Sequence, residues 1–272
     1  MKKIHSLLLA ATSLIAVACT PTIEMLTYAP SMAGLDRGSP MVVFPEYQNE
    51  VGIELANTIK SKLEEKNYFR MGVPNVNAVC IYNIGTSREI LDTFRDSGNK
   101  LDRVRVTLTG RLVVTGPEDI LHSRTISVTD TGSIYNDSQR DFYRLLDYEE
   151  FADNVVADIV PHSYIYEVEI EPAKGNSMLE HAAECCADGD WEQGRFLAEN
   201  SLTVFPNDPE GYYLLGMIAR QERNFDAARD YFRQAAEISY AERYNKAITD
   251  TDVIEQNEAL VRKQMNGAPM PK

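Results

Sequence analysis

The sequence EGYYLLGMIARQERNFDAARDYFRQAA, residues 210–236, decides the fold of the last third of this 272-residue chain. It repeats features of an earlier stretch at a spacing of 34 residues: Gly189-Asp190-Trp191 recurs as Arg223-Asn224-Phe225, and Leu202 recurs as Ala236. A fixed period of this length is typical of solenoids built from pairs of helices. The spacing therefore predicts two helical repeats within residues 173–240, and the alternative is a coincidental pair of helical hairpins.

The second unit resembles a tetratricopeptide repeat. Its matching residues stand where that family places Trp, Leu, Gly, Tyr, Ala, Phe and Ala: Tyr212, Leu215, Gly216, Ala219, Ala228, Phe232 and Ala235. The first unit departs more from the pattern, with small residues at the later positions: Ala182, Gly194, Ala198 and Ser201. The resemblance implies an all-α domain in which small residues let paired helices approach closely and large residues fill the space between them.

Two repeats alone bury little apolar surface, so the last pair needs a cap. Residues 241–265 carry apolar side chains that suit a closing helix, with a break near Thr249-Asp250 left open: Tyr244, Ile248, Val253, Ile254, Leu260 and Val261. We therefore expect the tetratricopeptide-repeat domain to span residues 173–266. Gly267, Pro269 and Pro271 predict a disordered tail over residues 267–272.

The resemblance also implies a groove, because the first helix of each such repeat lines the concave side of the solenoid. Counting from Leu215 and Gly216 places five residues there: Glu210, Tyr213, Met217, Arg220 and Gln221. The same count in the first repeat gives Asn176, Leu179, Ala183 and Cys186, with Cys185 in the core and Cys186 accessible. Aromatic, methionine and arginine side chains anchor many protein interfaces, so we expect a peptide or partner segment to bind here. The alternative is that the closing segment or the first domain fills the groove permanently.

The chain begins like a secretory signal, with Lys2 and Lys3 before an uncharged apolar stretch over residues 4–18. Residues 14–18 before Cys19 resemble a bacterial lipobox, in which the signal is cut before a cysteine that becomes lipidated. We therefore interpret residues 1–18 as a lipoprotein signal peptide and Cys19 as the lipidation site; the alternatives are an uncleaved anchor or a plain signal. Thr20 is not the Asp that retains enteric lipoproteins in the inner membrane, so the outer membrane is expected, on its periplasmic side or at the cell surface.

The charge of the chain excludes nucleic acid as a partner. Its formal net charge is -14, and loss of the two signal lysines makes the mature chain more negative still, whereas phosphate contacts need an excess of Lys and Arg. A membrane contact must then come from the acyl chains alone. Proline and glycine at Pro21, Pro30, Gly34 and Gly38 predict that residues 19–39 form a lipidated, flexible linker.

Residues 40–172 alternate between strand and helix patterns. Strands are expected at 41–44, 80–84, 104–112, 120–128 and 164–170, and helices at 49–66, from Ser87 to Ser97-Gly98, and at 148–159. The order predicts an α+β chain: a mixed-sheet, sandwich-like α/β domain in its amino-terminal part, followed by the all-α repeats, with the boundary near Pro172. This order resembles the sheet domain of the TolB amino terminus, and the whole chain resembles an uncharacterised group of gram-negative outer-membrane lipoproteins with terminal repeats.

No motif for catalysis, metal or cofactor binding occurs in the sequence. Cys80, Cys185 and Cys186 are an odd set that cannot form a complete disulfide framework. His122 and His162 have no identifiable nucleophile partner and are interpreted as structural. We therefore expect no catalytic residue, no metal, no cofactor and no enzyme activity.

Three functions follow from these patterns. The first is a lipid-anchored envelope protein that acts as a protein-interaction scaffold through its repeats. The second is an accessory subunit or regulator of an export or peptidoglycan-synthesis machine, and the third is an enzyme. The expected partners are other envelope proteins or peptides, with membrane contact through the lipid anchor; the oligomeric state stays open.

Overall fold

The computed structural model describes residues 20–45, 49–72 and 77–271. The chain divides into two compact units, each built from two separate stretches. Among the described residues, Thr20–Met25 and Tyr166–Thr251 form the unit that we call the repeat unit, and Leu26–Ile165 with Asp252–Pro271 form the sheet unit. A mixed sheet and a set of helical repeats are both present, so the predicted α+β class is confirmed.

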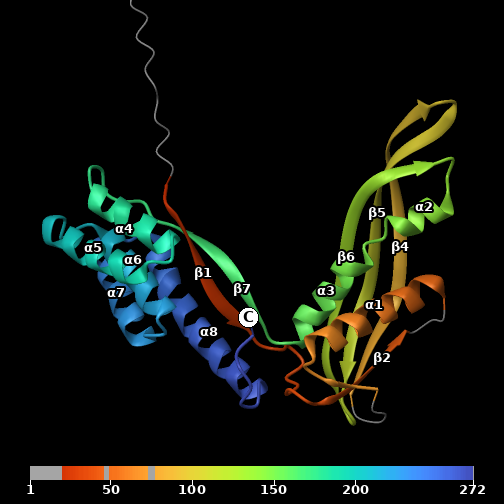
Figure 1. The fold of residues 1–272 in the computed structure, drawn as a ribbon, viewed down its shortest axis with the longest axis horizontal. Coiled ribbons are helices and arrows are strands. Elements are labelled where there is room, and N and C mark those ends of the chain that lie inside the picture. The colour runs from red at the N-terminus through yellow and green to blue at the C-terminus, as the bar shows by residue number, and fades with distance from the viewer. Residues whose placement is uncertain (1–19, 46–48, 73–76, 272) are drawn as a thin grey trace, which may run out of the picture. The chain divides into compact units, whose positions relative to one another are not determined.

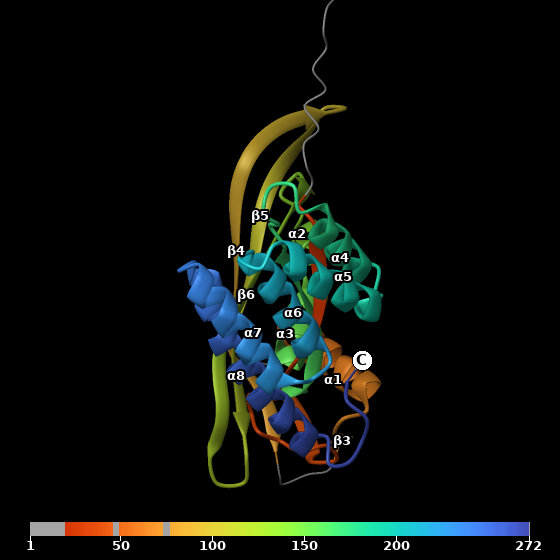
Figure 2. The same ribbon diagram turned by 90° about the vertical axis from the view of Figure 1, so that its left-hand side faces the viewer.

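The sheet unit contains five strands in the spatial order β3-β2-β4-β5-β6. Their bounds are β2 Pro40–Pro45, β3 Arg70–Met71, β4 Ala78–Asp96, β5 Asn99–Thr115 and β6 Ile120–Tyr135. β2 runs parallel to β3 and β4, whereas β4, β5 and β6 form an antiparallel meander whose long strands lie side by side in both views (Figures 1 and 2). The strands predicted at 104–112 and 120–128 are confirmed as parts of β5 and β6. The turn between them is closed by the Gly116 N–H, which donates to the Asp119 carbonyl at 2.8 Å.

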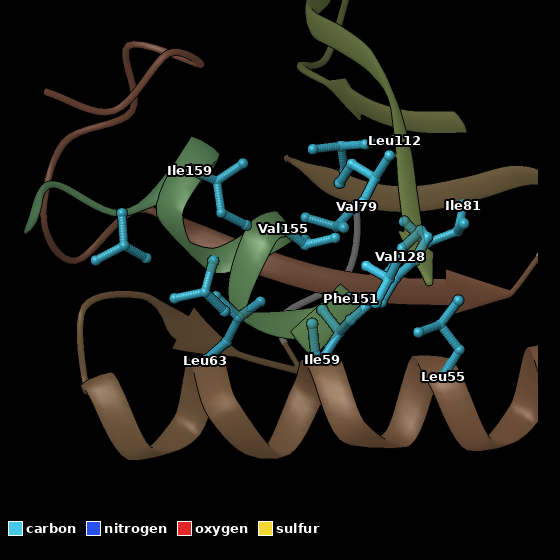
Figure 3. Packing of buried hydrophobic residues seen from close by; sticks show 14 of the residues in the cluster. Leu55, Ile59, Leu63, Val79, Ile81, Leu112, Val128, Phe151, Val155 and Ile159 are labelled. Atoms are coloured by element: carbon cyan, nitrogen blue, oxygen red, sulfur yellow. The ribbon is translucent and has the colours of Figure 1, made fainter. Parts of the chain in front are cut away.

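Two helices cover one face of this sheet, α1 (Glu50–Lys66) and α3 (Tyr148–Ile159), while the short α2 (Gln139–Arg144) precedes α3. Side chains spaced by four along α1 meet those of α3 and the strands in one core (Figure 3): Leu55, Ile59, Leu63, Phe151, Val155, Ile159, Val79, Ile81, Leu112 and Val128. Each fully buried side chain of this size contributes about 1.5–3 kcal/mol. Both helices begin within one residue of the predicted positions, since Asn49 and Asp147 cap their first turns.

The helix predicted after Ser87 is wrong. Residues 78–96 form the single strand β4, and Ile90 pairs with Val104 while Phe94 pairs with Leu101. The apolar residues Ile90, Leu91 and Phe94 fit a helical period equally well, but the long strand β5 supplies backbone partners along the whole segment. Tertiary pairing therefore overrides the local pattern.

The flexible linker predicted at residues 19–39 is also wrong in part. Residues Thr22–Ala29 form strand β1, which pairs with β7 (His162–Glu169) in a separate two-stranded sheet. Ile23 and Met25 are buried. The predicted last strand of the first domain thus belongs to this small sheet, and the division between the units falls at Ile165, not at Pro172.

Four helices and the start of a fifth make up the helical part of the repeat unit: α4 Ser177–Ala187, α5 Trp191–Val204, α6 Pro209–Gln221, α7 Phe225–Ile238 and α8 Glu242–Gln264. In each of the first four, an Asn or Asp side chain caps the first turn: Asn176, Asp190, Asp208 and Asn224. The closing helix is present, and it continues through Thr249-Asp250 without a break.

The end of the chain departs from the predicted repeat domain and tail. From Asp252 onward the chain belongs to the sheet unit, and Val261 and Met265 are buried in the core of that unit. Ala268 and Met270 pack against the same core, and the Ala268 N–H donates to the Met265 carbonyl at 3.0 Å. Residues 267–270 are therefore held by packing and are not a disordered tail.

Candidate functional site

Two helical glycines of the repeat unit, Gly194 and Gly216, lie where paired helices approach closely. A Cβ atom at Gly216 of α6 would overlap the ring of Phe232 on α7, and one at Gly194 of α5 would overlap the Cys186 sulfur on α4. Within the described part of the unit, α4 to α7 lie side by side in both views (Figures 1 and 2). The small residues therefore act as the resemblance implied.

The predicted groove is not open. Gln221 is half-buried. The other six groove residues are buried: Leu179, Cys186, Glu210, Tyr213, Met217 and Arg220. Asn176 and Ala183, from the same count, are buried as well. The expectation for the neighbouring cysteines is reversed, since Cys186 is buried and Cys185 is partly exposed. The alternative interpretation, a groove filled by the chain itself, describes the structure.

Two strands and the closing helix fill the groove. Val168 of β7 and Ile170, the residue directly after β7, share one buried cluster with Tyr213 and Met217. Ile23 and Met25 of β1 belong to the same cluster. Tyr244 and Ala247 at the start of α8 belong to the same cluster. The sequence carried a signal for β1, because its buried residues Ile23, Met25 and Thr27 alternate with a period of two.

Glu210 holds this arrangement together from the first turn of α6. Its side chain is 3% exposed, and the carboxylate accepts hydrogen bonds from the Tyr244 hydroxyl and, at 3.0 Å, from the Glu171 backbone N–H. The Arg243 guanidinium pairs with the same carboxylate. A buried carboxylate needs such partners, so Glu210 acts as a structural connection between α6, α8 and the end of β7.

Arg220 is a buried cation without a carboxylate partner in the described part of the chain. Its guanidinium carbon lies 5.6 Å from the ring centre of Tyr166 and 5.4 Å from that of Phe232. One terminal nitrogen donates to the Met217 sulfur at 2.6 Å, whereas Nε and Nη1 are buried without a hydrogen-bond partner. Cation–π attraction to two rings offsets part of the desolvation cost. Arg220 therefore serves packing rather than an accessible partner.

A pocket of about 320 Å³ remains in the repeat unit beside the filled groove. Tyr213 and Met217 reach it from α6, and its rim carries charged side chains of both signs, from β7 and α8: Glu167, Glu169, Arg243, Lys246 and Asp250. Lys246 and Asp250 form an exposed pair at 2.8 Å, one helical turn apart. Burial raises the pKa of Tyr213 to about 12, so its hydroxyl stays protonated at neutral pH. The pocket has room for one or two side chains of a partner.

The other polar clusters of the described residues have structural partners. Asp158 of α3 is buried and binds Arg124 at 2.6 Å and His122 at 3.1 Å, both from β6. His162 lies 3.3 Å from the Val160 carbonyl. Among the described residues, no group of three or more His, Cys, Asp or Glu side chains has the geometry to hold a metal ion.

The lipidation site and signal peptide lie outside the described residues. Cys19 and residues 1–18 therefore stay a sequence prediction. Among the residues that are described, no helix is both long enough and apolar enough to cross a membrane.

Comparison with known proteins identifies the second helical pair. The family model of the tetratricopeptide repeat matches residues 209–242, which include α6, α7 and the start of α8. No curated protein matches the chain. The match does not extend to the first helical pair or to the sheet unit.

Three solved structures resemble part of the chain at low similarity. A minor lipoprotein from Acinetobacter baumannii is 12% identical with a TM-score of 0.33, over 43% of this chain and 88% of its own. Rare lipoprotein B from Shewanella oneidensis is 12% identical with a TM-score of 0.28, over 43% and 91%. A hypothetical protein from Chlamydia trachomatis is 15% identical with a TM-score of 0.28, over 44% and 94%. These similarities are too low to indicate function, and the resemblance to the TolB amino terminus stays a prediction. What the comparisons do identify is a tetratricopeptide repeat, over residues 209–242.

Proposed function

We propose that this chain is a lipid-anchored envelope protein that binds a partner protein through its repeat unit. The observation that carries the proposal is the tetratricopeptide repeat at residues 209–242, together with the pocket that the filled groove leaves beside α6. Repeats of this kind present extended surfaces for other proteins. The lipobox-like residues 14–18 before Cys19 support a lipid anchor, and Thr20 supports the outer membrane as its location.

The partner engages the rim of the pocket rather than the whole concave side. Since β1, β7 and α8 already cover the groove residues, only a protruding side chain of the partner enters, and the rest of the contact lies on exposed charges. Substitution of Lys246 and Asp250 tests this surface most directly, because both residues line the pocket and both are exposed. Charges at the edge of an interface set its orientation and its rate of association.

The test exchanges these two charges within the full chain. Lys246→Asp combined with Asp250→Lys keeps the net charge, and the acid then precedes the base along the helix, which is the better order for helix stability. We expect recovery of a cross-linked partner from intact cells to fall at least tenfold, because opposite charges on the partner now meet like charges. Thermal unfolding of the variant should match that of the natural chain.

A matched exchange on α7 serves as the control. Asp230→Arg with Arg233→Asp inverts another exposed pair, 2.6 Å apart, that does not line the pocket. Partner recovery should stay unchanged in this variant. Equal recovery in both double variants, or equal loss in both, would contradict binding at the pocket.

The proposed role is binding, not catalysis, and it requires no cofactor. An accessory role in an export or peptidoglycan-synthesis machine is compatible with it, since such a machine is one class of envelope partner. Identification of the recovered protein by mass spectrometry separates these partners from one another.

A further inference from the structure

The sheet unit contains a second and larger cavity, of about 580 Å³, that no part of the proposed function uses. Its walls come from the ends of α1 and α3 and from the last residues of the chain. Eight of its lining side chains are apolar: Val156, Ala157, Val160, Pro161, Met265, Pro269, Met270 and Pro271. A cavity of this size with mostly apolar walls and a few polar groups is typical of small-molecule sites.

The polar groups of the cavity carry an excess of positive charge. Arg37 and Lys66 line it, and neither forms an ion pair within the described part of the chain. The acidic residue in the lining is Asp153, and it is already engaged by Lys62 at 2.6 Å. Two cations without an ion pair beside an apolar cavity are unusual in a chain whose net charge is -14.

Hydrogen bonds hold together the segments that line the cavity beside Arg37 and Lys66. The Arg37 backbone N–H donates to the Gln264 carbonyl at 2.8 Å, and the buried Tyr68 hydroxyl lies within hydrogen-bond distance of the Leu35 and Gln264 carbonyls. These bonds connect the segment of Arg37, the end of α1 and the end of α8. The cavity is thus a feature of the fold itself and not a gap beside a loose segment.

We propose that this cavity binds the acyl chain of a fatty acid, with Arg37 and Lys66 holding its carboxylate. The apolar walls suit the methylene chain, each methylene of which gains from leaving water. A guanidinium forms two parallel hydrogen bonds to a carboxylate, and an ammonium adds a point charge. Charge complementarity therefore favours a single-chain anionic amphiphile over a neutral apolar ligand.

The direct test is calorimetric titration of the full chain, carrying Cys19→Ala so that it has no acyl group of its own. Dodecanoate and dodecanol, both below their aggregation limits, are the two probes. We expect one dodecanoate per chain, and dodecanol about tenfold weaker, which is the usual effect of one charge-assisted hydrogen bond. Failure of dodecanoate to bind, or equal affinity for both probes, would overturn the proposal.

Three variants, one of them a control, separate the carboxylate contact from the chain contact. Arg37→Gln with Lys66→Gln should lower dodecanoate affinity to that of dodecanol, whereas Lys60→Gln with Lys174→Gln removes the same charge away from the cavity and should change nothing. Ala157→Phe fills the apolar part and should abolish binding of both probes. Unchanged binding in the first or third variant contradicts the assignment.

A mapping experiment keeps the proposal testable even if Ala157→Phe fails to fold. A fatty acid with a photoreactive diazirine on its chain should label peptides from residues 153–162 and 265–271 of the unaltered chain. Excess dodecanoate should suppress that labelling. Labelling confined to other parts of the chain would place the fatty acid elsewhere and refute the site.

Discussion

The Tyr244 hydroxyl donates a hydrogen bond to the Glu210 carboxylate, and the two residues are 34 positions apart, which is one repeat period. Glu210 lies in the first turn of α6, and Tyr244 lies in the first turn of α8. The start of α8 thus occupies the place where the first helix of a third repeat would begin. One hydrogen bond between equivalent positions connects the cap to the last complete repeat.

Tyr244→Phe should destabilise the repeat unit by about 1–3 kcal/mol, because it leaves the buried Glu210 carboxylate with one donor fewer. Urea unfolding followed by circular dichroism measures the change. Tyr240→Phe is the matched control, since Tyr240 is 95% exposed and should unfold like the natural chain. Equal midpoints for the two variants would show that the Tyr244 hydroxyl adds no stability.

Two substitutions of Arg220 should have different effects on the free energy of unfolding. Arg220→Met keeps most of the apolar volume between Tyr166 and Phe232 and removes two buried nitrogen atoms that lack a hydrogen-bond partner. It should therefore be as stable as the natural chain or more stable. Arg220→Ala leaves a cavity in the same place and should cost about 3 kcal/mol. If methionine is as harmful as alanine, the guanidinium has a favourable role that packing does not explain.

The local patterns of the sequence are sufficient for α1, α3 and the helices of the repeat unit, but not for the short α2 or for the strand partners. The caps and four-residue spacings of α1 and α3 lie within each helix, so a reading of the sequence finds them. The course of β4 beyond Tyr82 depends on pairing with β5, whose first residues follow a turn at Ser97-Gly98, and no local signal excludes a helix there.

The groove residues could likewise be predicted from the local pattern, but the segments that cover them could not. The positions of Glu210, Tyr213, Met217 and Arg220 on one side of α6 follow from the repeat pattern, and the structure brings them together. What covers them could not be inferred, because β1 lies near residue 22 and β7 near residue 162. Pro21 and Pro30 flank β1, and prolines at such positions are equally typical of a linker. The alternation of Ile23 and Met25 is the local signal that favours a strand.

The sheet unit should depend on residues from the far end of the chain. Val261→Ala is expected to cost about 2 kcal/mol, because Val261 is fully buried in the core of the sheet unit. Val253→Ala is the matched control on the same helix, since Val253 is 50% exposed and should change stability little. A fragment of residues 40–172 lacks Val261 and Met265, so we expect it to unfold without a cooperative transition. Cooperative unfolding of that fragment would show that the end of the chain is dispensable.

Cys19 should carry the lipid anchor. In cells supplied with a labelled fatty acid, the natural chain should take up the label and sediment with membranes. Cys19→Ala should lose both properties, because two or more acyl chains are needed for stable attachment. Cys80→Ala removes another thiol and should keep both. Equal label in the natural chain and in Cys19→Ala would contradict the assignment.

Stability should fall at alkaline pH because buried tyrosines resist ionisation. Burial raises the pKa of Tyr213 to about 12, compared with about 10 for an exposed tyrosine. The unfolded chain therefore loses this proton first, so the contribution of Tyr213 is fully present below pH 10 and declines as the pH rises toward 12. The free energy of unfolding should decrease with a shallower slope over this range in Tyr213→Phe than in the natural chain. Tyr240→Phe, which alters an exposed hydroxyl, should keep the natural slope, and an identical slope in all three proteins would show that Tyr213 ionises normally.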